Sequence, residues 1–204
     1  MSPPPPDAGD DAAWVKVEMP LPPPALHAFL ADIERLYRIN PWLEIDRFER
    51  RSDGVFRLAG RNLSNEQAVD VAVSLVENQP GRSLVLRYDG GIKRETRCEI
   101  EPAGAGSVLT ITETYDTPPP EEREARLKEV DRSLVPWAAA LRAFLLHGAR
   151  WGRLPGYRLY MRRVWLPMTP KQRRITRLIV WTTAIEFVVF LFVFAIFWNE
   201  AGRG

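Results

Sequence analysis

Cysteine and histidine are both scarce: the chain of 204 residues contains one cysteine and two histidines. The single cysteine, Cys98, excludes an intramolecular disulfide and a thiolate metal cluster, which agrees with a reducing compartment. His27 and His147 are too isolated to suggest a metal site. The sequence also has no Gly-rich phosphate loop, no His-Glu-x-x-His and no Gly-x-Ser-x-Gly motif. We therefore predict neither a metal nor a cofactor, and the enzyme classes built on these motifs are disfavoured.

Acidic residues are absent between Arg132 and Arg177, a stretch that holds eleven Arg and Lys residues. Residues 1–131 carry a net charge of −8 and residues 132–204 a net charge of +10. Attraction to anionic lipid, worth about 1 kcal/mol for each basic residue near the surface, explains a basic region beside an apolar segment. We therefore expect a lipid bilayer as partner and no nucleic acid.

A long apolar run follows this basic stretch. Leu178–Trp198 spans 21 residues. As a helix it would measure roughly 31 Å, enough to cross a hydrocarbon core about 30 Å thick. Glu186, near the centre, costs about 2.5–3.5 kcal/mol, which the surrounding Leu, Ile, Val and Phe residues outweigh. The sequence predicts one transmembrane helix, 178–198, followed by a short tail, 199–204.

The flanking charges predict the topology of this helix. Basic flanks stay in the cytoplasm, and Met1–Ala13 is proline-rich and acidic, without the apolar core of a secretory signal. We expect a cytoplasmic N-terminal domain anchored by a single C-terminal helix. The Arg-, Ala- and Pro-rich composition favours a bacterial inner membrane.

Two features near this helix are candidates for contacts at the membrane. The juxtamembrane connector, 153–177, mixes aromatic rings with arginines, which suits the headgroup layer, although docking onto a membrane-protein partner would use the same residues. The residues predicted at the interface are Trp151, Tyr157, Arg162, Arg163, Trp165, Arg173 and Arg174. Glu186 either contacts another helix, from a second copy or another membrane subunit, or is tolerated in its protonated form.

The N-terminal part of the chain alternates strand-like and helical patterns. After a disordered lead, 1–12, we expect a strand over 14–19 and a helix over 24–37. Six more strands follow at 43–50, 54–59, 68–77, 83–88, 93–101 and 107–115, separated by turns too short for crossover helices. A long helix then begins near Glu121 and is kinked or split at Pro136. The predicted fold class is α+β, with a curved antiparallel sheet covered by this helix.

Patterns within residues 13–152 resemble the START-like helix-grip superfamily (SRPBCC), which includes polyketide cyclase/dehydrase-like proteins. They are the Val15-Lys-Val-Glu18 strand, the Ala28-Phe-Leu-Ala-Asp32 helix, the tryptophan in Asn40-Pro-Trp-Leu43, and the terminal helix through Trp137 and Phe144. Such proteins hold an apolar ligand between the sheet and the long helix. The resemblance implies a cavity lined by inward-facing residues. Alternation along the strands selects Leu86, Tyr88, Arg94, Cys98, Ile111 and Glu113, and the apolar stripe of the long helix adds Trp137, Leu141 and Phe144.

Glu113 is the main candidate for chemistry in this domain. On the expected register its carboxylate faces inward, and a buried acid with a raised pKa suits a general acid or base. Arg94 would lie on the same face and could pair with it. A place at the cavity mouth, or a bulge that turns Glu113 to solvent, is the alternative. His147 is expected to complement a helix dipole, and Cys98 to be a small core residue.

Three functions fit these expectations. The leading one is a membrane-tethered START-like domain that binds or hands over an apolar, lipid-like ligand at the cytoplasmic membrane surface, a task that needs no catalytic array. The alternatives are a cyclase/dehydrase-like enzyme acting on an apolar substrate with Glu113 as base, and an assembly or scaffold subunit of a membrane complex that uses Glu186.

Overall fold

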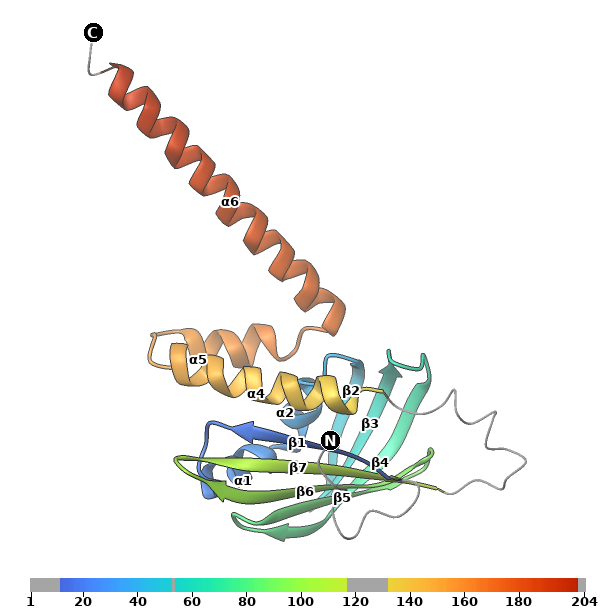
Figure 1. Cartoon of the computed structure of the whole chain (residues 1–204). Coiled ribbons are helices and arrows are strands. Elements are labelled where there is room, and N and C mark those ends of the chain that lie inside the picture. Colours follow the sequence, from blue (N-terminus) through green and yellow to red (C-terminus); the bar gives the residue numbers. More distant parts are fainter. Residues whose placement is uncertain (1–11, 53, 117–131, 202–204) are drawn as a thin grey trace. The chain divides into compact units, whose positions relative to one another are not determined.

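The computed structural model describes residues 12–52, 54–116 and 132–201. The chain divides into two compact units, Met1–Pro167 and Met168–Gly204 (Figure 1). The first unit contains a sheet and the helices that pack on it, and the second contains one long helix. Residues 1–11 of the predicted lead, 1–12, and the predicted helix start near Glu121 lie outside the described residues, whereas Ala12 already belongs to a strand.

Seven antiparallel strands form a single sheet in the order β1-β7-β6-β5-β4-β3-β2. Their bounds are β1 Ala12–Met19, β2 Leu43–Ser52, β3 Val55–Asn62, β4 Ala68–Gln79, β5 Ser83–Asp89, β6 Lys93–Ala103 and β7 Gly106–Tyr115. From β2 to β7 each strand pairs with the next along the chain, because short turns connect them, and β1 pairs with β7. The seven strands and their antiparallel meander confirm the predicted sheet.

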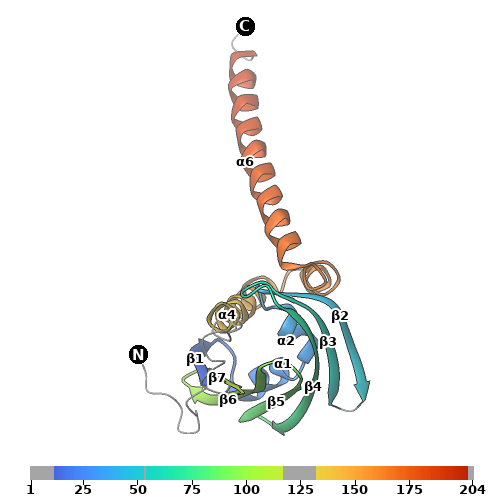
Figure 2. The ribbon, with the colours of Figure 1, turned by 90° about the vertical axis from the view of Figure 1, so that its right-hand side faces the viewer.

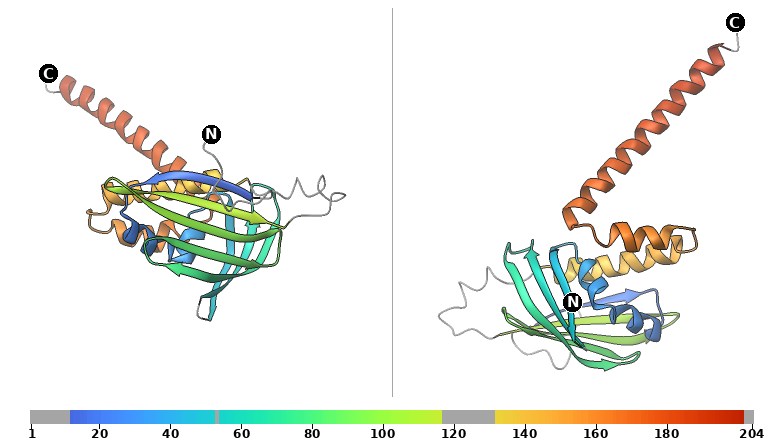
Figure 3. Two further views of the ribbon diagram at one scale, coloured as in Figure 1. Left: turned by 60° about the horizontal axis from the view of Figure 1, so that its bottom comes forward. Right: turned by 180° about the vertical axis from the view of Figure 1, so that it is seen from behind.

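One face of the sheet is buried, as the alternation of side chains predicts. Leu86 of β5, Cys98 of β6 and Ile111 of β7 have no exposed surface, whereas Glu95 and Arg97 point to the other face and pair there at 3.1 Å. The two helices between β1 and β2 lie on the buried side, and the sheet curls around them (Figures 2 and 3). The core therefore fills the concave side of the sheet.

Two short helices, α1 Pro23–Leu30 and α2 Ile33–Arg38, replace the single helix expected over 24–37. The chain breaks between them because the Asp32 carboxylate accepts a hydrogen bond from the Arg35 backbone N–H at 3.2 Å and so caps a new helix. The break lets α1 cover β5, β6 and β7 while α2 contacts β2.

The long helix of the first unit is α4, Leu134–Trp151. Pro136 lies in the first turn of α4, where a missing N–H removes no helical hydrogen bond. The helix expected before it, from Glu121, lies outside the described residues, so the kink or split at Pro136 stays a prediction. The helix α4 packs against β1, and its apolar side buries Trp137, Leu141 and Leu145. It therefore covers the open side of the curved sheet as predicted (Figure 2).

A short α-helix, α5 Tyr157–Tyr160, continues into a π-helical turn, η2 Met161–Trp165. The second unit is dominated by α6, Pro170–Ala201, of 32 residues. Within α6, the stretch Pro170–Asn199 contains an 18-residue window with a mean hydropathy of 2.4, and the helix is long and apolar enough to cross a membrane. The predicted 178–198 span lies wholly inside α6, and the basic residues from Lys171 to Arg177 lie in its first turns.

A close backbone approach fixes the β2–β3 pair. Gly60 of β3 lies opposite Ile45, where β2 carries a bulge, and a Cβ atom on residue 60 would collide with the Glu44 carbonyl oxygen. A Cβ on Gly148 of α4 would meet open space. The same substitution should therefore have opposite effects at these two glycines.

We predict that Gly60→Ala lowers the free energy of unfolding by roughly 1–3 kcal/mol, because the two strands must move apart. Gly148→Ala should leave it unchanged or raise it by up to about 1 kcal/mol, since alanine favours a helix. Thermal unfolding of the full-length protein in detergent, followed by circular dichroism, measures both. Equal melting temperatures for wild type and Gly60→Ala would contradict a rigid contact.

Candidate ligand cavity

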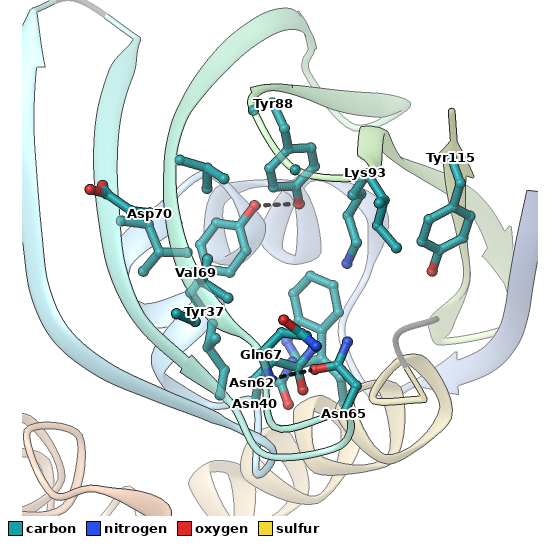
Figure 4. A pocket seen from close by; sticks show the side chains of 18 residues that line it. Tyr37, Asn40, Asn62, Asn65, Gln67, Val69, Asp70, Tyr88, Lys93 and Tyr115 are labelled. Carbon is teal, nitrogen blue, oxygen red and sulfur yellow. Dashed lines mark hydrogen bonds between the residues drawn. The ribbon is translucent and has the colours of Figure 1, made fainter. Parts of the chain in front are cut away.

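A cavity of about 330 Å³ lies at one end of the concave face of the sheet. Its walls come from α2, α4, strands β2 to β7 and the turns between them (Figure 4). Apolar side chains provide one part of the lining, including Leu43, Leu58, Val69, Val71, Ile92 and Trp137. Polar residues provide the other part, namely Tyr37, Asn40, Asn62, Asn65, Gln67, Asp70, Tyr88, Lys93 and Tyr115. The site thus combines a surface for a hydrocarbon with a set of hydrogen-bonding groups.

A chain of hydroxyl groups crosses the wall between α2 and β6. The Tyr37 and Tyr88 hydroxyls lie 2.6 Å apart, and Tyr88 is 2.8 Å from the Thr96 hydroxyl. Burial raises the pKa of Tyr37 well above its ordinary value. Burial also raises the pKa of Tyr88, although the nearby Lys93 ammonium opposes that shift. Both phenols therefore stay neutral near pH 7 and can donate or accept hydrogen bonds.

An ion pair stands beside this chain. The Lys93 ammonium lies 2.6 Å from one Glu113 carboxylate oxygen, and the Tyr115 hydroxyl donates to the other at 2.7 Å. Glu113 is fully buried, whereas the Lys93 side chain keeps 20% of its surface exposed. Lys93 and Tyr115 therefore line the cavity, and Glu113 lies beneath them without lining it. In Figure 4 the Lys93 ammonium points into the cavity.

A β-bulge at Arg94 sets which basic residue meets Glu113. Lys93 pairs with Tyr115 and Glu95 with Thr114, so Arg94 is an extra residue in β6. Its side chain is 70% exposed and pairs with Asp116 at 2.6 Å. The expected Arg94–Glu113 pair is therefore wrong: the bulge lies in β6 rather than at Glu113, and Lys93 takes the inward position.

Three asparagines shape the opposite side of the cavity. The Asn40, Asn62 and Asn65 side-chain oxygens accept hydrogen bonds from the backbone N–H groups of residues 42, 64 and 67, at 2.9, 2.9 and 3.1 Å. Each asparagine thereby closes a local turn. Their oxygens are engaged by the backbone, and the Asn40 amide nitrogen also donates to the Ser133 hydroxyl at 3.2 Å. This side of the cavity therefore carries amide N–H groups rather than amide acceptors. The three asparagines were not among the residues predicted from the sequence. The preference of asparagine for turns could have indicated them.

Solved structures share this architecture at low sequence identity. A START superfamily protein from Mycobacterium smegmatis matches with a TM-score of 0.50 and 17% identity, over 67% of this chain and 97% of that one. The protein TTHA0849 from Thermus thermophilus matches with a TM-score of 0.52 and 17% identity, over 68% and 99%. The di-domain ARO/CYC StfQ from the steffimycin biosynthetic pathway matches with a TM-score of 0.51 and 16% identity, over 69% of this chain and 52% of that protein.

The first unit has the START-like helix-grip fold. Protein-family models give no match to the sequence, and curated proteins give no significant match. Identities this low establish the fold alone. The ligand and the activity of this START-like domain must therefore be argued from its own residues.

The structure brings only part of the predicted cavity set together. Tyr88 and Trp137 line the cavity, and Glu113 supports it from behind. Four of the predicted residues lie in the packed core instead: Leu86, Cys98, Ile111 and Leu141. Phe144 packs against the Phe29 ring of α1 at 5.8 Å. These residues do not line the cavity because α1 fills that end of the concave face.

The remaining candidates lie outside the cavity. The His147 ring nitrogen lies 2.7 Å from the Ala143 carbonyl oxygen within α4. Cys98 is a buried core residue, and burial raises the pKa of its thiol to about 12. Glu186 lies within α6, and its contact with another helix stays a prediction. Among the residues that the structure describes, no three His, Cys, Asp or Glu side chains group as a metal site would require.

The predicted interface residues divide by position. Trp151, Arg162 and Arg163 are exposed, and Tyr157 is half-buried. Trp165 turns inward, with its ring 5.7 Å from that of Phe144. Arg173 and Arg174 lie in the first turns of α6. The π-helical turn accounts for the inward turn of Trp165, because the wider turn shifts the residues after Tyr160 around the helix axis.

Proposed function

We propose that this chain is a membrane-tethered START-like domain that binds or hands over an apolar, lipid-like molecule at the cytoplasmic surface of the membrane. The observation that carries the proposal is the cavity of about 330 Å³, with a wall of aliphatic side chains and Trp137. This volume lies near the lower end of the range of typical small-molecule sites, roughly 300–1,000 Å³. Binding and release require a cavity and an opening, and no catalytic group.

The helix α6 supports the tether. It is apolar enough over Pro170–Asn199 to cross a bilayer, and its first turns carry four basic residues, Lys171, Arg173, Arg174 and Arg177. Basic residues at one end of a span are retained on the cytoplasmic side. The START-like domain precedes this end in the chain, which favours a cytoplasmic position for it.

The segment of α5 and η2 supports a direct contact with lipid headgroups. Leu159 and Tyr160 are 63% and 43% exposed, and Arg162 is exposed beside them. Trp165 and Leu166 attach the other side of the segment to the domain. An exposed row of apolar and basic side chains suits the anionic headgroup layer.

A second candidate function is catalysis on an apolar substrate, and the buried Glu113 with its Lys93 and Tyr115 partners favours it. The pair could shuttle a proton at the cavity wall. If so, Glu113→Gln should abolish turnover of the substrate while leaving ligand binding in place, as measured by product formation and by binding on the same sample. Unchanged turnover would remove Glu113 as the base.

We predict that native mass spectrometry of the full-length protein in mild detergent detects one apolar molecule bound per chain. Val69→Trp should fill the cavity and abolish this adduct, because Val69 lines it. Val76→Trp is the matched control, since Val76 is 45% exposed on the same strand and outside the cavity. Equal adducts in both variants, or none in the wild type, would argue against a ligand in this cavity.

The membrane contact can be tested with a fluorescent label. A polarity-sensitive dye on Leu159→Cys should shift to shorter wavelength in anionic nanodiscs, because the label would enter the headgroup layer, whereas the dye on Val76→Cys should not. The native thiol will not react near pH 8, because Cys98 is fully buried and its pKa is about 12. Identical spectra at both positions would contradict the proposed interface.

A further inference from the structure

One charged side chain among the described lining residues points into the cavity. Lys93 and Asp70 both line it, but the Asp70 carboxylate points away from it (Figure 4) and pairs with Arg57 at 2.9 Å. The Lys93 ammonium therefore supplies the electrostatic character of the wall. Its charge is matched at 2.6 Å by the Glu113 carboxylate.

This pairing fixes which ligand head groups the wall can accept. Glu113 has no exposed surface, and both of its oxygens receive hydrogen bonds, from Lys93 and Tyr115. The pair presents ammonium N–H groups to the cavity but no net positive charge. A ligand carboxylate would place a second anion beside Glu113 in a region of low dielectric, and it would lose its hydration without gaining a free cation. A neutral oxygen would gain hydrogen bonds at little cost.

The surrounding side chains complete the recognition. The Tyr88 ring lies 5.7 Å from the Lys93 ammonium, and the Tyr37–Tyr88 hydroxyl pair offers both a donor and an acceptor nearby. Val69 and Ile92 supply apolar surface in the same cavity. An oxygen at one end of a hydrocarbon chain can therefore meet the polar wall while the chain covers the apolar one.

We infer that the cavity selects uncharged amphiphiles with a hydroxyl or carbonyl oxygen, and that the Lys93–Glu113 pair excludes free carboxylates. The inference rests on the proposed ligand-binding function and adds the chemical class of the ligand. It assigns Glu113 a role in specificity: its charge cancels that of Lys93, so the cavity is not an acid-binding site.

Competition binding to the full-length protein in mild detergent at pH 8 tests the inference. The probes are decan-1-ol, methyl decanoate and decanoate, which share one chain and differ in the head group. Native mass spectrometry counts each adduct, and the Val69→Trp protein supplies the background of binding outside the cavity. The alcohol and the ester should each occupy the cavity at least about tenfold more than the acid, because only the acid adds an anion.

Glu113→Gln should reverse this preference. The Lys93 charge then lacks the Glu113 anion, so decanoate binding should rise about tenfold or more, while the alcohol changes by less than about threefold. Arg94→Met is the matched control, because Arg94 is the neighbouring cation and faces solvent. It should bind all three probes like the wild type.

Three results separate the claims. Equal binding of ester and acid by the wild-type protein overturns the inference, and that comparison stands even where Glu113→Gln fails to fold. A folded Glu113→Gln protein that still rejects decanoate overturns the role of Glu113. If none of the three probes gives an adduct that is lost in Val69→Trp, the ligand-binding function itself fails, and the inference with it.

Discussion

The Trp137 side chain joins the layers of the domain, and the cavity depends on it. Its indole N–H donates to the Leu36 carbonyl oxygen at 2.9 Å, and its ring stacks on Tyr37 at 5.8 Å between centroids. Tyr37 in turn meets Tyr88 of β5 through their hydroxyls. One line of contacts thus runs from α4 through α2 to the sheet. Because Trp137 is only 1% exposed, this line holds α4 against α2 and fixes one wall of the cavity beside the core.

Burying the Lys93–Glu113 pair at the cavity wall costs free energy on folding, and this cost is informative about the function of the pair. A buried ion pair loses hydration that its mutual attraction rarely repays in full, so it is weak evidence for stability. An aliphatic pair in place of Lys93 and Glu113 would extend the apolar core toward the cavity. The bulge at Arg94 interrupts the regular pairing of β6, and it is this interruption that turns Lys93 inward. Two local costs at the wall of a cavity are more easily explained by recognition than by folding.

The sheet and the apolar helix could be predicted from the sequence because both depend on short, repeated patterns. Alternation along β6 places Cys98 and Ile100 inward whatever the rest of the chain does. The Arg94 bulge could not be predicted, since one extra residue changes no propensity and reverses the positions of Lys93 and Arg94. The break at Asp32 was missed for a related reason, because a capping carboxylate competes with an otherwise continuous apolar stripe. The extent of the cavity depends on where α1 lies, and tertiary packing rather than a local sequence pattern determines that position.

Under the proposed function, the tether changes which part of the ligand can be recognised. An apolar chain gains about 0.8 kcal/mol for each methylene that leaves water, and it gains nearly the same in a bilayer as in a cavity. For a ligand that starts in the membrane, the free energy of moving its hydrocarbon chain into the cavity is therefore close to zero. What remains is the shape of the cavity and the exchange of headgroup hydrogen bonds for those of the wall. A domain anchored beside its ligand reservoir needs little affinity for the chain. Its selectivity must come from the shape of the cavity and from the few polar side chains at its wall, where the Lys93–Glu113 pair carries the charge.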